Sequence, residues 1–119
     1  MSEFTEFLHE VFAGFGPITL RRMFGGHGVY HEGLMFGLVA DDVLYLKVDE
    51  QNRQCFEVLG LAPFEYGKDG KVMKLSYYAA PPKLMDDVDE AAAWARRSYE
   101  AALRARSKLA ARAGNRRLR

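Results

Sequence analysis

The stretch Arg21-Arg22-Met23-Phe24-Gly25-Gly26-His27-Gly28-Val29-Tyr30 decides how the first half of the chain folds. Apolar and aromatic residues surround three closely spaced glycines, which is typical of extended chain with a local backbone irregularity. A phosphate-binding loop would need those glycines between a strand and a helix, so that backbone N–H groups face the phosphate. Here Val29 and Tyr30 continue as strand. We therefore predict a structural motif of Phe24, Gly25, Gly26 and Gly28, with a bulge or close strand crossing at Gly25-Gly26.

Strand patterns continue on both sides of this stretch. Short runs of β-branched, aromatic and aliphatic residues alternate with turn formers such as His31-Glu32-Gly33, Asp41-Asp42 and Lys68-Asp69-Gly70-Lys71. The predicted strands are residues 18–24, extended or followed by 28–31, then 34–39, 43–48, 64–66 and 72–79. The pattern predicts an antiparallel sheet of about five strands, in which residues 64–66 pair with residues 72–79.

Three helices are predicted around this sheet. The first is amphipathic, with Ser2 as its N-cap and an apolar face formed by Phe4, Phe7, Leu8, Val11, Phe12 and Phe15. A short middle helix is capped by Asp49 and stopped by Gly60. A long last helix begins after Asp86 and fades beyond Leu109, with a stop at Gly114-Asn115 and a frayed end at residues 116–119. The predicted fold class is α+β.

Charge is distributed unevenly along the chain. Residues 1–95 carry 15 acidic and 8 basic side chains, a net charge of −7. Residues 96–119 carry nine basic side chains against Glu100 alone, a net charge of +8. An acidic body with a basic tail is consistent with a solvated helix, or with a contact for nucleic acid or an acidic protein.

The totals exclude several classes of protein. With 119 residues, of which 49% are hydrophobic, the chain fits one folded domain. No apolar run approaches the ~20 residues of a membrane span, and the N-terminus lacks the features of a secretory signal. Cys55 is the single cysteine and cannot form an internal disulfide. These features predict a cytoplasmic protein.

The opening stretch resembles the first strand motif of the TfoX/Sxy family N-terminal domain, and later blocks extend the resemblance over roughly residues 5–105. Those blocks are Gly33-Leu34-Met35-Phe36-Gly37-Leu38-Val39, Val43-Leu44-Tyr45-Leu46-Lys47-Val48-Asp49, Pro63-Phe64-Glu65-Tyr66, Met73-Lys74-Leu75-Ser76-Tyr77-Tyr78 and the helix bearing Trp94. The resemblance implies an α+β fold and kinship with regulators of natural competence that act alongside transcription machinery. Full-length regulators of this family carry a second, helical domain. We expect residues 1–105 to form a stand-alone domain of the N-terminal type and residues 106–119 a basic extension of its last helix.

No residue pattern argues for catalysis, a cofactor or a metal. His27 and His31 would lie about 13 Å apart on a continuous strand, too far apart to share one ion. Cys55 lacks a local base and is expected to be a buried apolar residue. No pair of carboxylates stands out for acid/base chemistry. We therefore expect a protein that is not an enzyme.

The candidate contact residues are arginines and one lysine. Alternation places Arg21 and Arg22 on opposite faces of a strand, where each is either part of a structural ion pair or a partner contact. Spacings of seven, four and four place further basic side chains near one helical stripe that can follow phosphates. These are Arg97, Arg104, Lys108 and Arg112. No aromatic residues interleave with that stripe to stack on bases.

The sequence leaves three functional hypotheses. The favoured one is a regulatory module that binds a protein partner, related to transcription machinery, and forms a homodimer through an uncovered sheet edge or face. The alternative is a nucleic-acid-binding module that uses the basic last helix. The weakest is an enzyme or small-ligand binder with a site near Arg21, Arg22, Tyr45 and Ser76.

Overall fold

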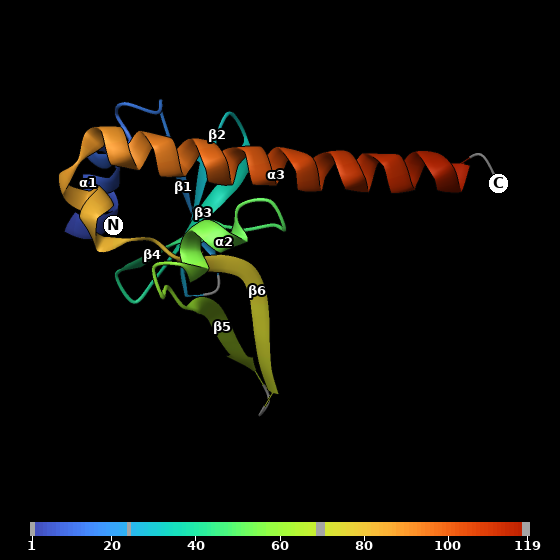
Figure 1. The fold of residues 1–119 in the computed structure, drawn as a ribbon, viewed down its shortest axis with the longest axis horizontal. Helices are drawn as coiled ribbons and strands as arrows, with labels where there is room; N and C mark the ends of the chain where they lie inside the picture. Colours follow the sequence, from blue (N-terminus) through green and yellow to red (C-terminus); the bar gives the residue numbers. More distant parts are fainter. Residues whose placement is uncertain (1, 24, 69–70, 118–119) are drawn as a thin grey trace.

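The computed structural model describes residues 2–23, 25–68 and 71–117. Helix α1 (Glu3–Val11) precedes four strands, β1 (Thr19–Met23), β2 (Gly26–His31), β3 (Leu34–Ala40) and β4 (Val43–Lys47). Helix α2 (Arg53–Glu57) leads to β5 (Pro63–Lys68) and β6 (Lys71–Ala79). The 3₁₀ helix η1 (Pro82–Asp86) and helix α3 (Val88–Arg117) complete the described chain. The α+β class, the antiparallel sheet and the three predicted helices are confirmed (Figure 1).

The sheet has six antiparallel strands in the order β1-β2-β3-β4-β6-β5. The predicted pairing of β5 with β6 is confirmed. The sheet has one strand more than the five predicted. The additional strand arises within residues 21–30, where the predicted bulge is wrong. Arg22 pairs with His27 and Met23 with Gly26, so β1 and β2 form a hairpin. Phe24, a member of the predicted motif, lies outside the described residues, as do Asp69 and Gly70 of the predicted β5–β6 turn.

Two glycines explain why a hairpin replaces the bulge. Gly25 has φ +74°, a left-handed conformation that favours glycine in tight turns. At Gly26 a Cβ atom would lie 1.9 Å from the carbonyl oxygen of Val39, so only a residue without a side chain lets β2 and β3 approach there. The close strand approach at Gly26 is therefore confirmed, and the irregularity lies in β3 instead. There the register shifts opposite Val29 and Tyr30, so that Phe36 is the extra residue.

All the described helices pack on one face of the sheet. Leu8 of α1 and its C-cap Phe12, Phe56 of α2, Leu84 of η1 and Trp94 of α3 join one buried cluster with side chains from β1 to β4. The ring centroids of Phe12 and Phe36 are 5.5 Å apart, and those of Phe56 and Trp94 are 4.9 Å apart, both edge to face. We call this side of the sheet the covered face.

Helix boundaries depart from the prediction at three places. Asp87, and not Asp86, caps α3, since its carboxylate accepts from the backbone N–H groups of Asp89 and Glu90. The predicted cap Asp49 instead closes the turn before α2, where its carboxylate accepts from the N–H groups of Gln51 and Asn52. The residue at the N-cap position of α2 is Asn52. The predicted stop at Gly114-Asn115 and the predicted fraying at residues 116–117 are wrong, because α3 continues to Arg117, and residues 118–119 lie outside the described residues. The N-cap Ser2 of α1 is confirmed. Phe7, predicted on the apolar face of α1, is instead 43% exposed, because the helix turns the side that carries Leu8 and Val11 to the core.

Candidate binding surfaces

The face of the sheet opposite the helices carries a second set of aromatic and apolar side chains. Residues directly opposite each other in an antiparallel pair point to the same side. Tyr30 opposes Met35, Leu38 opposes Tyr45, and Lys47 opposes Tyr77. We call this surface the tyrosine face. Among the described side chains, its aromatic, methionine, cationic and buried members are Arg21, Met23, Tyr30, Met35, Leu38, Tyr45, Lys47, Phe64 and Tyr77.

Side chains of the tyrosine face pack on one another. Leu38 and Phe64 are buried although neither belongs to the covered-face cluster. The rings of Tyr45 and Phe64 meet edge to face with centroids 4.8 Å apart. Gly28 makes room for this packing, because a Cβ atom there would lie 2.9 Å from the sulfur of Met23 and 2.9 Å from the ring of Tyr30. The result is a partly exposed layer of tyrosine and methionine.

Two cations among the described side chains of the tyrosine face lie over tyrosine rings. The Arg21 guanidinium is 4.9 Å from the centroid of Tyr30, and the Lys47 ammonium is 5.2 Å from that of Tyr77. Lys47 Nζ also donates a hydrogen bond of 2.7 Å to Ser76 Oγ. Burial lowers the pKa of Lys47, an effect that the charge of Asp49 opposes, and burial with Tyr30 nearby raises the pKa of Tyr77 to about 12.

Arg104 is held by Asp49. Its Nε and Nη2 atoms donate to the two carboxylate oxygens at 2.5 and 3.0 Å, a bidentate ion pair between residues 55 positions apart in the sequence. These hydrogen bonds hold the pKa of the Asp49 carboxyl below its usual value. The pair fastens α3 to the turn after β4. A hollow of about 260 Å³ lies beside it, and Lys47, Arg53 and Lys108 are among its lining residues.

Beyond Ala105, helix α3 extends past the body of the domain. Every side chain from Arg106 to Gly114 is exposed, and Figure 1 shows this part of the helix without neighbouring elements. We call residues 106–114 the arm. Lys108 and Arg112, two of the predicted contact residues, lie in it. The sequence after Glu100 contains no acidic residue, so the arm is an exposed, positively charged length of helix.

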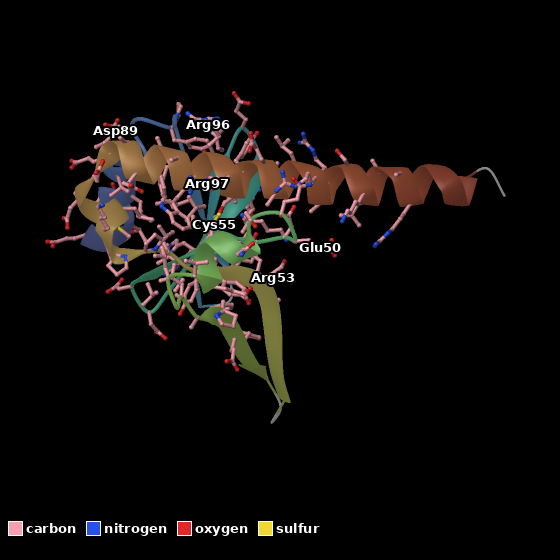
Figure 2. All side chains as sticks on the ribbon, in the orientation of Figure 1. Glu50, Arg53, Cys55, Asp89, Arg96 and Arg97 are labelled. Carbon is pink, nitrogen blue, oxygen red and sulfur yellow. The ribbon has the colours of Figure 1, made fainter. Side chains whose placement is uncertain are left out.

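The other predicted contact residues lie apart from the arm. Arg97 sits on the packed half of α3 with its guanidinium 5.2 Å from the centroid of Trp94, beside the body of the domain (Figure 2). Arg21 and Arg22 point to opposite faces as predicted, and no ion pair joins either of them to a described residue. Arg22 lines a hollow of about 470 Å³ with His27, Asp41 and Asp42.

The structure does not bring together the residues of the predicted small-ligand site. Tyr45 lies on the tyrosine face with Arg21, whereas Arg22 lies on the other face, and Ser76 is bonded to Lys47. Sequence reasoning missed Tyr30, Lys47 and Tyr77 as a group, because each lies on a different strand. The alternation of Val43, Tyr45 and Lys47 along β4 was the available signal.

His27 and His31 lie on the covered face with Val29, but their rings lie in different environments. His31 Nδ1 is 2.7 Å from the carbonyl oxygen of Pro17, and its ring packs on Phe15 and Tyr99. His27 Nε2 is buried without a hydrogen-bond partner among the described residues. Within the described ranges, no group of three or more His, Cys, Asp and Glu is placed to hold a metal ion. Cys55 is half-buried against the core.

None of the helices in the described part of the chain is both long enough and apolar enough to cross a membrane.

Comparison with known proteins gives two matches. The model of the TfoX N-terminal domain matches residues 10–102. The chain is also similar to the DNA transformation protein TfoX1 of Aliivibrio fischeri, with 32% identity over 83 residues. That match covers 64% of this chain and 40% of the relative, so the chain spans less than half the length of the protein it resembles.

Proposed function

The chain belongs to the TfoX N-terminal domain family, and we propose that it is a non-enzymatic regulatory module that acts through protein contacts. The name of its Aliivibrio relative concerns DNA transformation. We propose the same setting for this chain, a cytoplasmic partner in the machinery that controls transcription of genes for DNA uptake.

The tyrosine face is the observation that carries this proposal. Tyrosine, methionine and arginine are enriched in the centres of protein interfaces, and lysine is not. This face combines three tyrosines with two methionines and Arg21, on a rigid sheet that the covered face already stabilises. Since its members Leu38 and Phe64 are already buried, a partner would contact the tyrosines, the methionines and the two cations.

Affinity capture from a lysate of the native host, with and without nuclease treatment, tests the class of partner. We expect the tagged protein to retain the same protein partner after nuclease digestion. Loss of all retained protein after digestion would contradict the proposal, because it would show that the contacts run through nucleic acid.

The arm favours a second candidate function, binding of nucleic acid. Arg106, Lys108 and Arg112 are exposed on a stretch of helix that contains no acidic residue, and each phosphate contact made by such a residue adds to a salt-dependent affinity. In a gel-shift titration of duplex DNA, the variant R106S/K108S/R112S would lose affinity and its dependence on salt would become shallower. Unchanged binding by this variant, which keeps Arg104 and its ion pair, would exclude the arm.

A further inference from the structure

The arm presents an apolar side chain between two cations. Leu109 is 64% exposed, the one large apolar side chain among residues 106–114. Arg106 and Arg112 lie three residues before and after it, so that the three share one side of the helix. An exposed leucine contributes nothing to binding phosphates. Its position between two arginines fits a surface that is apolar at its centre and acidic at both ends.

Helix α1 presents the opposite arrangement on its outer side. Phe7 is 43% exposed, and Glu3 and Glu10 lie four residues before and three residues after it. With Glu6 these side chains line a shallow surface hollow of about 450 Å³. The inner side of α1 packs on the core through Leu8 and Val11, and the outer side carries the exposed Phe7.

The spacings of the two patterns match. At about 1.5 Å per residue, Arg106 and Arg112 are roughly 9 Å apart along their helix, and Glu3 and Glu10 are roughly 10.5 Å apart along theirs. We propose that the arm docks on the outer side of α1 of a second copy of this chain. Leu109 then packs on Phe7, and the two arginines face the two glutamates.

The placement of both elements lets this contact form twice in a closed dimer. Helix α1 lies beside the first half of α3, and the arm lies at the other end of the same helix (Figure 1). Leu109 follows Val88 by 21 residues, about 31 Å of helix, so the arm cannot reach α1 of its own chain. When two copies place their α3 helices antiparallel, each arm lies beside the α1 of the other copy. A two-fold axis then relates the two contacts.

A second copy of this chain as the partner of the arm accounts for more of the exposed side chains than nucleic acid does. A phosphate backbone would account for the basic side chains of the arm but not for Leu109, and it would leave the exposed Phe7 and its glutamates without a role. The proposal is independent of the function assigned to the tyrosine face, since that face takes no part in the contact.

Charge reversal provides the test, with light-scattering mass as the readout. One variant carries E3K/E10K on α1 and the other carries R106E/R112E on the arm. We expect the wild type to approach twice the monomer mass of 13.5 kDa at about 50 mM salt and to dissociate at about 500 mM salt, where surface charges are screened. Each variant alone is expected to remain a monomer. An equimolar mixture is expected to dimerise, because both contacts of the mixed pair again join opposite charges.

Two controls keep the result interpretable. The pair K83E/R96E changes the net charge by as much as R106E/R112E does, at exposed sites outside the arm, and is expected to dimerise like the wild type. The uncharged substitutions F7S and L109S are each expected to weaken the dimer without affecting the fold, as checked by circular dichroism. A wild type that is monomeric at all concentrations would overturn the proposal. A folded mixture of the two variants that stays monomeric would also overturn it. The same holds for a wild type that associates only when nucleic acid is added.

Discussion

The two faces of the sheet are built from similar residue types but differ in how far their side chains are exposed. On the covered face, Val29, Phe36 and Leu46 are fully buried under helices. On the tyrosine face, Tyr30, Tyr45 and Tyr77 keep part of their surface exposed, and cations lie over two of the rings. The covered face therefore stabilises the fold, and the tyrosine face is free to bind. Substitutions that separate stability from binding test this difference.

The largest expected effect is on the covered face. Phe56→Ala removes a ring that packs on Tyr78 and Trp94, and we expect it to lower the free energy of unfolding by about 3–5 kcal/mol. Urea denaturation followed by circular dichroism measures the loss. Val58→Ala, two residues away and 74% exposed, is the matched control and should change stability by less than about 0.5 kcal/mol.

The second effect concerns the close approach of β2 and β3 at Gly26. Gly26→Ala places a methyl group against the carbonyl oxygen of Val39, and we expect a loss of roughly 2–3 kcal/mol as β2 and β3 move apart. Gly67→Ala in β5 adds the same group where no atom lies within 4 Å. Equal thermal stabilities of the two variants would refute the close approach.

The third effect concerns how α3 is fastened over the sheet. Asp49→Asn replaces the charged partner of Arg104, and we expect a loss of about 1 kcal/mol at neutral pH, since the pair is partly exposed. Because the pKa of Asp49 is lowered in the folded state, its contribution is present above the unfolded pKa of about 4 and disappears as the pH falls below it. Asp42→Asn, in the exposed β3–β4 turn, should leave this part of the pH profile unchanged, and unfolding curves from pH 7 to pH 3 measure both.

A fourth effect concerns how Tyr77 of the tyrosine face makes the stability of the fold depend on pH. The pKa of Tyr77 is raised to about 12, so its stabilising contribution is complete below the unfolded pKa of about 10 and is lost as the pH rises towards 12. We expect the wild type to lose about 1 kcal/mol more than Tyr77→Phe between pH 9 and pH 11. Parallel loss in both proteins would show that Tyr77 is not shielded from water.

The smallest effect on stability is expected for the cation of the tyrosine face. Arg21→Ala removes an exposed side chain that contacts one ring, and unfolding should change by less than about 0.5 kcal/mol. Thermal denaturation measures this. A larger loss would mean that the tyrosine face stabilises the domain as the covered face does.

Much of this architecture is predictable from local patterns. The apolar spacing in α1, the turn formers between strands and the pairing of β5 with β6 were all readable, because each depends on neighbouring residues. The β1–β2 hairpin was not, since the same glycines suit a bulge or a turn, and the close contact at Gly26 depends on Val39 in another strand. Gly114-Asn115 failed as a stop because isolated glycines are tolerated within a helix.

The candidate surfaces were less predictable than the fold. Lys108 and Arg112 were identified from helical spacing, and both lie in the exposed arm. Arg104 followed the same spacing but is held by Asp49, a contact between residues far apart in the sequence. The tyrosine face combines residues of all six strands, and only the strand order shows that they share one side of the sheet.

The most direct test of the regulatory proposal uses two adjacent arginines that point to opposite faces. Arg21→Glu and Arg22→Glu change charge equally, one on the tyrosine face and one on the other. Tagged wild type and both variants would be used for capture from nuclease-treated lysate of the native host, with quantification of the retained proteins by mass spectrometry. We predict that Arg22→Glu retains the partner of the wild type and that Arg21→Glu loses it. Equal retention by both variants, or loss with Arg22→Glu alone, would contradict the account.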